Sequence, residues 1–156
     1  MAEKERKNIA VNRSARHNYF IEETYEAGIA LTGTEVKSLR LGKGNLQDSF
    51  ARIANGEIML ENCHISPYDF GNRFNHEPTR PRKLLMHRKE IIRLFSKVRE
   101  QGLTLVPLQM YFNEQGRVKV ELALARGKKL HDKRDDIAKK DAAREVDRAL
   151  RDRQRR

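Results

Sequence analysis

The side chains that could bind a metal or act as a nucleophile are few and scattered. The sequence contains one cysteine, Cys63, and five histidines: His17, His64, His76, His87 and His131. None of them falls in an H-E-x-x-H or C-x-x-C pattern, so we expect no metal site. Cys63 and His64 are neighbours at the end of an expected strand. Because strand neighbours point to opposite faces, they are poorly placed as a nucleophile–base pair, and we expect a structural role for Cys63.

Two further patterns give only weak indications of chemistry. Asp48, Glu57, Glu61 and Asp69 are candidate Mg²⁺ ligands of a nuclease, but their spacing equally fits solvated strand positions. Residues 41–45, LGKGN, lack the spacing of a phosphate loop and the Ser or Thr after the lysine, so a turn is expected there. We therefore expect neither catalytic residues nor a cofactor, with a metal-dependent nuclease as the alternative.

The charge of the chain is concentrated at its ends. The net charge is +11, yet residues 20–125 contain fifteen basic and thirteen acidic groups. Residues 1–19 contain five basic and two acidic groups, and residues 126–156 contain thirteen and seven. A nearly neutral body with basic ends indicates a polyanionic partner. Nucleic acid fits better than a membrane, because the C-terminal segment lacks a bulky apolar face.

The composition also indicates a cellular location. A single cysteine forms no internal disulfide, which is typical of a reducing compartment. No apolar run approaches the ~18 residues of a membrane helix, and no signal peptide is recognisable at the N-terminus. We expect a cytoplasmic protein.

The central part of the chain reads mostly as strands. Residues 49–54 and 57–63 flank Asn55-Gly56, the strongest short signal for a tight hairpin. Residues 103–112 and 117–125 flank a second turn, and Pro107 predicts an edge or a bulge. Two short apolar runs, at 19–21 and 28–31, are separated by acidic residues. In the last strand, alternate residues are apolar, which predicts one core face and one wet face; the apolar set is Val118, Val120, Leu122 and Leu124.

Two helices are expected between the strands. Thr32 and Glu35 have the spacing of a capping box, opening a helix through Arg40. A second helix is predicted from about 88 to 101, ending at Gly102, with an apolar stripe; the stripe consists of Ile91, Leu94, Phe95 and Val98. About six strands and two helices predict a small closed or nearly closed barrel, with an open sandwich as the alternative.

The segment between the predicted strands, residues 66–82, is rich in proline and is expected to be a loop. Its basic side chains, with the following lysine, form either an ordinary exposed connection or a basic rim on the barrel. These side chains are Arg73, His76, Arg80, Arg82 and Lys83.

The C-terminal segment differs from the body. Sixteen of residues 133–156 are charged, and local propensity favours a helix. The apolar stripe of Ile137, Val146 and Leu150 is too thin to dock this helix on the barrel. We expect the segment to be disordered when free and helical when bound.

Four distinctive blocks of sequence follow one another along the chain: residues 25–29 (YEAGI), 33–40 (GTEVKSLR), 82–85 (RKLL) and 127–134 (GKKLHDKR). In this order they closely resemble the SsrA-binding protein (small protein B) family of bacteria. The resemblance implies a mainly β protein with an oligonucleotide-binding-type β-barrel, two or three short flanking helices and a basic C-terminal tail. It divides the chain into an N-terminal arm (1–18), an RNA-binding barrel (19–126) and a tail (127–156).

The same resemblance implies a function without catalysis. Members bind the tRNA-like domain of transfer-messenger RNA (tmRNA) and deliver it to stalled ribosomes for trans-translation, which tags the nascent peptide and releases the ribosome. The implied partners are this RNA and the small ribosomal subunit, with the large subunit as an additional contact. Alanyl-tRNA synthetase and the aminoacyl-tRNA elongation factor act on the same RNA. A monomer and no cofactor are expected. A general RNA-binding ribosomal or assembly protein is the rival interpretation.

The resemblance also implies the site residues. On the body they are Glu26, Leu85 and Lys119, with Arg13, Arg16 and Lys37 as weaker candidates. From composition alone, Glu26 would be a solvated carboxylate and Leu85 a core residue. In the tail, the residues implied to meet the decoding centre are Gly127, Lys128, Lys129, His131, Asp132, Lys133 and Arg134.

Overall fold

The computed structural model of the chain describes residues 7–68, 77–128, 142, 144–146 and 148. The strands in chain order are β1 (Lys7–Val11), β2 (Tyr19–Ile29), β3 (Gly44–Asn45), β4 (Phe50–Ala54), β5 (Glu57–Glu61), β6 (His64–Ile65), β7 (Arg82–Leu85), β8 (Thr104–Phe112) and β9 (Val118–Gly127). The helices are α1 (Ala15–Asn18), α2 (Gly33–Arg40) and α3 (Arg88–Gln101).

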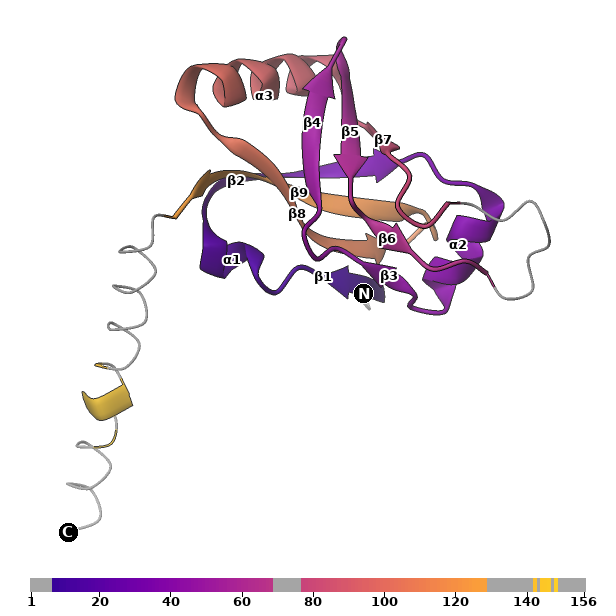
Figure 1. The fold of residues 1–156 in the computed structure, drawn as a ribbon, viewed down its shortest axis with the longest axis horizontal. Helices are drawn as coiled ribbons and strands as arrows, with labels where there is room; N and C mark the ends of the chain where they lie inside the picture. Colours follow the sequence, from indigo (N-terminus) through magenta and orange to yellow (C-terminus); the bar gives the residue numbers. More distant parts are fainter. Residues whose placement is uncertain (1–6, 69–76, 129–141, 143, 147, 149–156) are drawn as a thin grey trace.

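Six strands pair in a closed ring and form a small barrel (Figure 1). The order around the ring is β8, β4, β5, β7, β2 and β9, and β9 pairs again with β8. Strand β1 adds to β8, and β3 and β6 form a separate two-stranded sheet. The ring confirms the predicted barrel of about six strands, and the open-sandwich alternative is wrong.

Both predicted hairpins are confirmed. Ala54 pairs with Glu57 across the first turn, where Asn55 and Gly56 have φ angles of 53° and 75°. The second hairpin joins β8 and β9. The prediction of two separate runs before them was wrong: residues 19–29 form one eleven-residue strand, whose register shifts between Ile21 and Glu23. Residues 19–28 pair with β9, and this pairing keeps the acidic residues between the two apolar runs in an extended strand.

Strand β8 changes its neighbour at Pro107, pairing with β4 before the proline and with β1 after it. The β8–β9 register also shifts between Pro107 and Gln109, which confirms the predicted bulge. Proline has no N–H for a ladder, so it suits the point where pairing changes. Asn12 closes the junction: its backbone N–H donates to the carbonyl of Leu108 at 2.8 Å, and its side-chain amide donates to the carbonyl of Pro107 at 3.0 Å.

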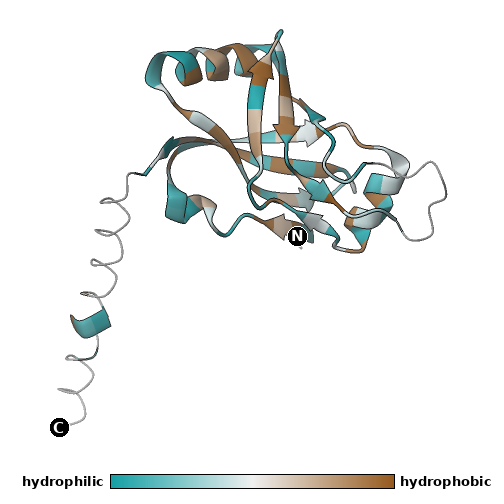
Figure 2. Cartoon of the chain, in the orientation of Figure 1, coloured by the Kyte–Doolittle hydropathy of each residue, from teal (hydrophilic) through white to brown (hydrophobic). Residues whose placement is uncertain are grey.

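Every strand of the ring contributes apolar side chains to the barrel interior. The most hydrophobic residues of the strands are coloured brown in Figure 2. In β9 the four residues predicted to face the core are all buried. The prediction of a wet opposite face was partly wrong, because Ala123 and Ala125 are buried as well. They pack in a second small cluster with Ala15 of α1 and with Val106 and Leu108 of β8.

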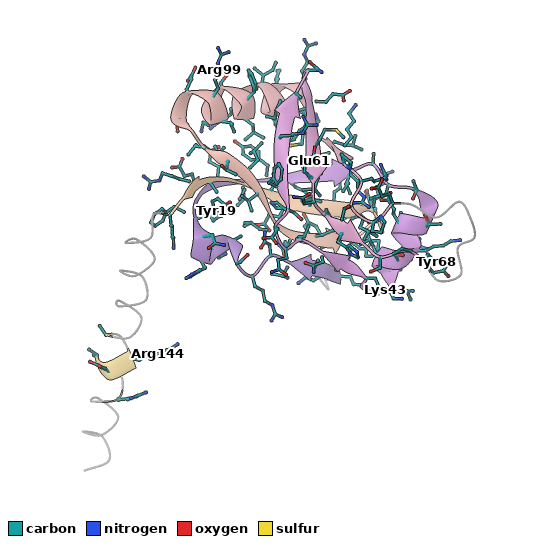
Figure 3. The ribbon with its side chains drawn as sticks, viewed as in Figure 1. Tyr19, Lys43, Glu61, Tyr68, Arg99 and Arg144 are labelled. Carbon is teal, nitrogen blue, oxygen red and sulfur yellow. The ribbon has the colours of Figure 1, made fainter. Side chains whose placement is uncertain are left out.

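Helices α2 and α3 are confirmed with the predicted ends. The capping box of α2 is complete, since the backbone N–H of Thr32 donates to Glu35 at 2.8 Å and the Thr32 hydroxyl accepts from the N–H of Glu35. Gly102 ends α3 in the left-handed conformation. Leu94 of the predicted apolar stripe is buried against the barrel, whereas Phe95 of the same stripe, about 100° further around the helix, is 44% exposed. Arg99 projects into solvent (Figure 3).

The sequence did not predict β1 or α1. Residues 7–11 lie in the sheet against β8, and Ala15 is 1% exposed. The body of the fold therefore begins before residue 19. The strand contains the apolar residues Ile9, Ala10 and Val11, and it forms by pairing with the edge of β8.

A buried ion cluster joins α2 to the strand that follows the 66–82 segment. Glu35 and Arg82 are both 0% exposed, and the Arg82 Nε–H donates to the Glu35 carboxylate. Arg80 donates to the same carboxylate at 2.5 Å. The remaining Arg82 donors reach the carbonyls of Cys63 at 2.6 Å and Pro78 at 3.0 Å. The guanidinium thus connects four parts of the chain.

This cluster corrects the prediction of a basic rim from this segment. Arg82 is fully buried, Arg80 is paired with a carboxylate, and Lys83 pairs with Glu57 at 3.4 Å. Arg73 and His76 lie outside the described residues. The sequence suggested that these basic side chains are exposed, because it does not show that the buried Glu35 carboxylate lies next to Arg82 as its counter-ion.

The Glu35 carboxyl is held ionised despite its burial. Burial raises its pKa, but hydrogen bonds from Arg80, from the Thr32 backbone and from Arg82 outweigh that effect and leave the pKa below its ordinary value. Replacing Glu35 by Ala leaves Arg82 buried without a counter-ion, so we expect a loss of about 3–5 kcal/mol in unfolding free energy. Urea unfolding at neutral pH measures this loss.

The exposed Arg52–Glu61 pair provides the control. Its two side chains are 55% and 17% exposed, and their separation is 2.6 Å. Glu61→Ala should cost no more than about 1 kcal/mol, because exposed ion pairs contribute little. Equal losses for the two variants would contradict a special role of the buried cluster.

A second ion cluster ties β2 to α3. Glu23 accepts hydrogen bonds from Lys97 at 2.5 Å and from Arg93 at 3.1 Å, and the Tyr25 hydroxyl also donates to it. These bonds, that of Lys97 above all, lower the pKa of Glu23 from its ordinary value of 4.5 to about 2.

This depressed pKa predicts a pH dependence of stability. The contribution of Glu23 is complete above its unfolded pKa near 4.5 and is lost as pH falls through about 2. Glu23→Gln should therefore be less stable than the unmodified chain at pH 6, and the difference should shrink between pH 4.5 and 2. Urea unfolding across this range measures it; a difference independent of pH would contradict the prediction.

Candidate nucleic-acid interface

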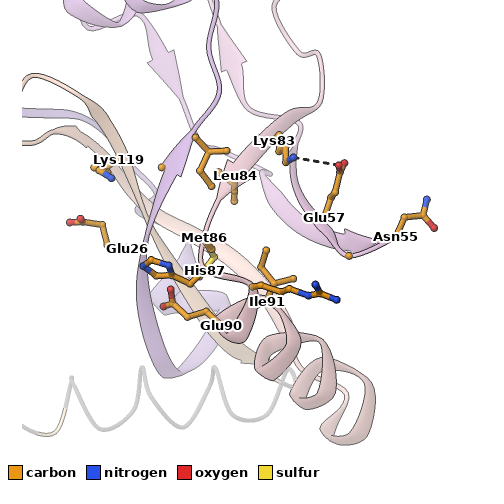
Figure 4. Close-up of a pocket in the computed structure, with 14 residues that line it drawn as sticks. Glu26, Asn55, Glu57, Lys83, Leu84, Met86, His87, Glu90, Ile91 and Lys119 are labelled. Carbon is orange, nitrogen blue, oxygen red and sulfur yellow. Dashed lines mark hydrogen bonds and ion pairs between the residues drawn. The ribbon is translucent and has the colours of Figure 1, made fainter.

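An open groove of about 870 Å³ lies where β2, β7 and β9 meet the start of α3. The three body residues implied by the family resemblance, Glu26, Leu85 and Lys119, all line it. Figure 4 shows Glu26 and Lys119 on one side, with Lys83 and Glu57 on the other. We call this feature the barrel groove. The fold thus brings together three residues that are far apart in the sequence.

Strand register explains how they meet. Leu85 of β7 pairs with Gly28 of β2, and Gly28 pairs with Lys119 of β9. Directly paired residues point to the same face, so Leu85 and Lys119 flank the bare backbone of Gly28. Leu85 is 52% exposed, so the alternative that it belongs to the core is wrong.

Gly28 has no positive φ that would require glycine, but its surroundings leave little room for a side chain. A Cβ at this position would lie 3.2 Å from the Cβ of Leu85. Glycine inside a strand is typical of a place where another group approaches the backbone closely. The groove floor at Gly28 is therefore flat backbone, beside the exposed apolar side chain of Leu85.

Glu26 lies two residues before Gly28, on the same face of β2. It is exposed, and its Oε2 accepts a hydrogen bond from the hydroxyl of Tyr111 in β8. Tyr111 itself is 1% exposed. Sequence reasoning missed Tyr111, although the alternation of β8 and β9 places it opposite Lys119.

Both signs of charge line the barrel groove. The basic side chains are those of Lys83, His87, Arg88 and Lys119, and the acidic side chains are those of Glu26, Glu57 and Glu90. A surface made only for phosphates would exclude carboxylates, because the charges repel. The mixture instead suits a ligand that presents phosphates together with hydrogen-bond donors such as base amino groups or ribose hydroxyls.

Arg13 and Arg16 line a smaller hollow of about 220 Å³ together with Gln109 and Glu121. Glu121 pairs with Glu26 across β2 and β9, so this hollow lies beside the barrel groove. Lys37 lies elsewhere: it is on α2, with its ammonium 5.6 Å from the centre of the Tyr68 ring. The structure groups the two arginines with the groove and leaves Lys37 apart.

The beginning of the predicted tail is attached to the body. Gly127 is the last residue of β9 and pairs with Tyr19. The Lys128 backbone N–H donates to the carbonyl of Asn18 at 2.9 Å, and its ammonium donates to the carbonyl of Arg16 at 3.1 Å. That ammonium also lies 4.8 Å from the centre of the Phe20 ring. The remaining predicted tail residues, Lys129, His131, Asp132, Lys133 and Arg134, lie outside the described residues.

The residues considered for catalysis are placed differently. Cys63 is fully buried, and burial raises its pKa to about 11, so its thiol is not an activated nucleophile. Among the described residues, no three His, Cys, Asp or Glu side chains come together as metal ligands. Glu57 and Glu61 are each paired with a cation, and Asp69 lies outside the described part.

Within the described part of the chain, no helix is both long enough and apolar enough to cross a bilayer.

Known proteins resemble this chain over nearly its whole length. Residues 9–152 match the family model described as SmpB protein. The chain is 69% identical over 149 residues to the SsrA-binding protein of Moorella thermoacetica, covering 96% of each. It is 67% identical over 154 residues to the SsrA-binding protein of Desulforamulus reducens, covering 99% of this chain and 96% of the relative.

A solved structure agrees with these relatives. It is described as "tmRNA-SmpB: a journey to the center of the bacterial ribosome", and one of its chains is 61% identical to this one. The match has a TM-score of 0.65 and covers 77% of this chain and 84% of that chain. These matches establish that the chain belongs to the SmpB protein family.

Proposed function

We propose that this protein binds the tRNA-like domain of tmRNA and delivers it to stalled ribosomes for trans-translation. The family supports this proposal, since its relatives are described as SsrA-binding proteins and its structural neighbour as tmRNA-SmpB in the bacterial ribosome. The observation that carries it furthest is the barrel groove, where Glu26, Leu85 and Lys119 meet from three strands. The role is one of binding, without catalysis, in the cytoplasm and as a monomer.

The groove residues have distinct roles in this proposal. Lys119 neutralises a backbone phosphate, while Leu85 and the bare backbone of Gly28 give an apolar, flat surface for a ribose or a base. Glu26 accepts hydrogen bonds from base amino groups or ribose hydroxyls, because a carboxylate repels phosphate. Arg13 and Arg16, in the adjoining hollow, extend the contact to further phosphates.

The tail has a separate role on the ribosome. We infer that Gly127, Lys128, Lys129, His131, Asp132, Lys133 and Arg134 meet the decoding centre of the small subunit, where no codon–anticodon pairing is available. The segment beyond them lies as a helix in the vacant mRNA channel and is disordered in the free protein. An intact message fills that channel, so the tail distinguishes stalled ribosomes by exclusion. The large subunit is an additional contact, and alanyl-tRNA synthetase and the elongation factor meet the complex through the shared RNA.

The attachment of Lys128 to the body supports this division. Its contacts with Asn18, Arg16 and Phe20 fix the direction in which the chain leaves the barrel. The Arg126 guanidinium also lies over the Phe20 ring, 5.1 Å from its centre. RNA bound in the groove and a tail fixed at this point would therefore keep a defined relation to each other.

Replacing Lys119 of the barrel groove should weaken RNA binding and should make the remaining binding less dependent on salt. We expect Lys119→Ala to reduce affinity for the isolated tRNA-like domain about fivefold to tenfold, and to lower the slope of log Kd against log salt by about one. Filter binding or fluorescence anisotropy at several salt concentrations, with bulk tRNA as competitor, measures both. Lys37→Ala removes the same charge from α2 and should have the smaller effect.

Two results would contradict the proposal. If bulk tRNA competes as well as the tRNA-like domain itself, the chain is a general RNA-binding protein. If Lys37→Ala weakens binding as much as Lys119→Ala, the barrel groove is not the RNA surface.

Deletion of residues 133–156 should separate the two roles. The truncated chain keeps the barrel groove and the contacts of Lys128, so its affinity for the tRNA-like domain should stay within about twofold of the full chain. Tag addition to a peptide stalled on a message without a stop codon should be abolished. Translation in a reconstituted system measures tagging; retained tagging by the truncated chain would refute the proposed role of the tail.

A further inference from the structure

An exposed acidic side chain in the barrel groove is held by a buried phenol. Glu26 lies on the surface of β2, yet its carboxylate accepts a hydrogen bond from Tyr111, whose side chain is 1% exposed. An exposed glutamate normally samples many rotamers, and ordering it on binding costs conformational entropy. Tyr111 removes part of that cost before any ligand arrives.

Strand register makes this contact possible. Tyr111 pairs with Lys119 across β8 and β9, and Lys119 pairs with Gly28 across β9 and β2. Glu26 is two residues before Gly28, so the phenol reaches diagonally across β9 to the carboxylate. The hydroxyl, the ammonium-bearing strand and the carboxylate therefore form one continuous outer surface of the sheet.

The chemistry of the bond is directional. The tyrosine O–H donates and the Glu26 Oε2 accepts, and a hydrogen bond to an ionised acceptor is stronger than one between neutral groups. An ionised carboxylate only accepts hydrogen bonds, so whatever it recognises must donate them. Base amino groups and ribose hydroxyls are the donors of an RNA surface.

We propose that Tyr111 is a positioning residue of the barrel groove: it fixes the Glu26 carboxylate in the orientation that accepts hydrogen bonds from a base or ribose of the bound RNA. Lys119 binds phosphates of the RNA. The Glu26 carboxylate, oriented by Tyr111, accepts hydrogen bonds from donor groups of the bases or riboses. The inference rests on the proposed function, because it assigns a role within the same RNA-binding groove.

A double-mutant cycle on the full chain tests the inference. The variants are Tyr111→Phe, Glu26→Ala and their combination, and the probe is the isolated tRNA-like domain at fixed salt. We expect Tyr111→Phe alone to weaken binding about fivefold, in the range of the net contribution of one ordinary hydrogen bond. In the Glu26→Ala background the same substitution should have no further effect, because the carboxylate that Tyr111 positions is then absent.

Salt dependence gives a readout that a merely structural role would not reproduce. Tyr111→Phe should leave the slope of log Kd against log salt unchanged, because it removes no phosphate contact, whereas Lys119→Ala lowers that slope by about one. Thermal unfolding and near-UV circular dichroism of each variant verify that the barrel stays folded.

The chain contains a matched control. Tyr25 donates the same kind of hydrogen bond to Glu23, on β2 but beside α3, and neither residue lines the barrel groove. Tyr25→Phe removes an equivalent phenol–carboxylate bond and should leave RNA affinity unchanged. If Tyr25→Phe weakens binding as much as Tyr111→Phe, the effect is general destabilisation and the inference is overturned.

The outcomes separate the inference from the function on which it rests. If the unmodified chain shows no preference for the tRNA-like domain, the proposed function fails and the inference with it. If the chain binds selectively and Glu26→Ala weakens binding, but Tyr111→Phe does not, only the inference fails. Equal losses from Tyr111→Phe with and without Glu26 would likewise overturn it.

Discussion

The pairing register of β9 between β2 and β8 is the constraint on which the rest of the structure depends. These two pairings close the barrel, bury alternate residues of β9 in the core, and turn Lys119 outward beside Gly28. A slip of one residue would exchange the two faces of the strand, placing a lysine in the core and valines on the surface. The apolar alternation therefore specifies the core and the groove together.

The buried ion cluster contributes to the same organisation. Glu35 belongs to the capping box of α2 and is also the counter-ion of Arg82 in β7. One carboxylate thus fixes the start of a helix and the strand that delivers Leu85 to the groove. Replacing such a pair by apolar residues is often tolerated in other proteins, so its value here lies in specifying how these segments meet.

The barrel groove and the C-terminal tail differ in how their charges are arranged. The barrel groove has cations and carboxylates in close proximity, which favours a patterned RNA surface over any polyanion. The tail begins where Lys128 is tied to α1 and β2, and the chain beyond it is strongly basic. The mixed charges of the groove and the net positive charge of the tail therefore lie in different parts of the chain.

The sequence by itself determined the local features: the Asn55-Gly56 turn, the capping box at Thr32, the ends of α3 and the alternation in β9, because each follows from the geometry of neighbouring residues. The family motifs also predicted Glu26, Leu85 and Lys119. Only the tertiary structure decided the rest. Strand β1 exists because β8 offers an edge, Arg82 is buried because Glu35 meets it, and Tyr111 reaches Glu26 because β9 lies between them. Such contacts join residues far apart in the sequence, and periodicity contains no information about which distant partners will meet.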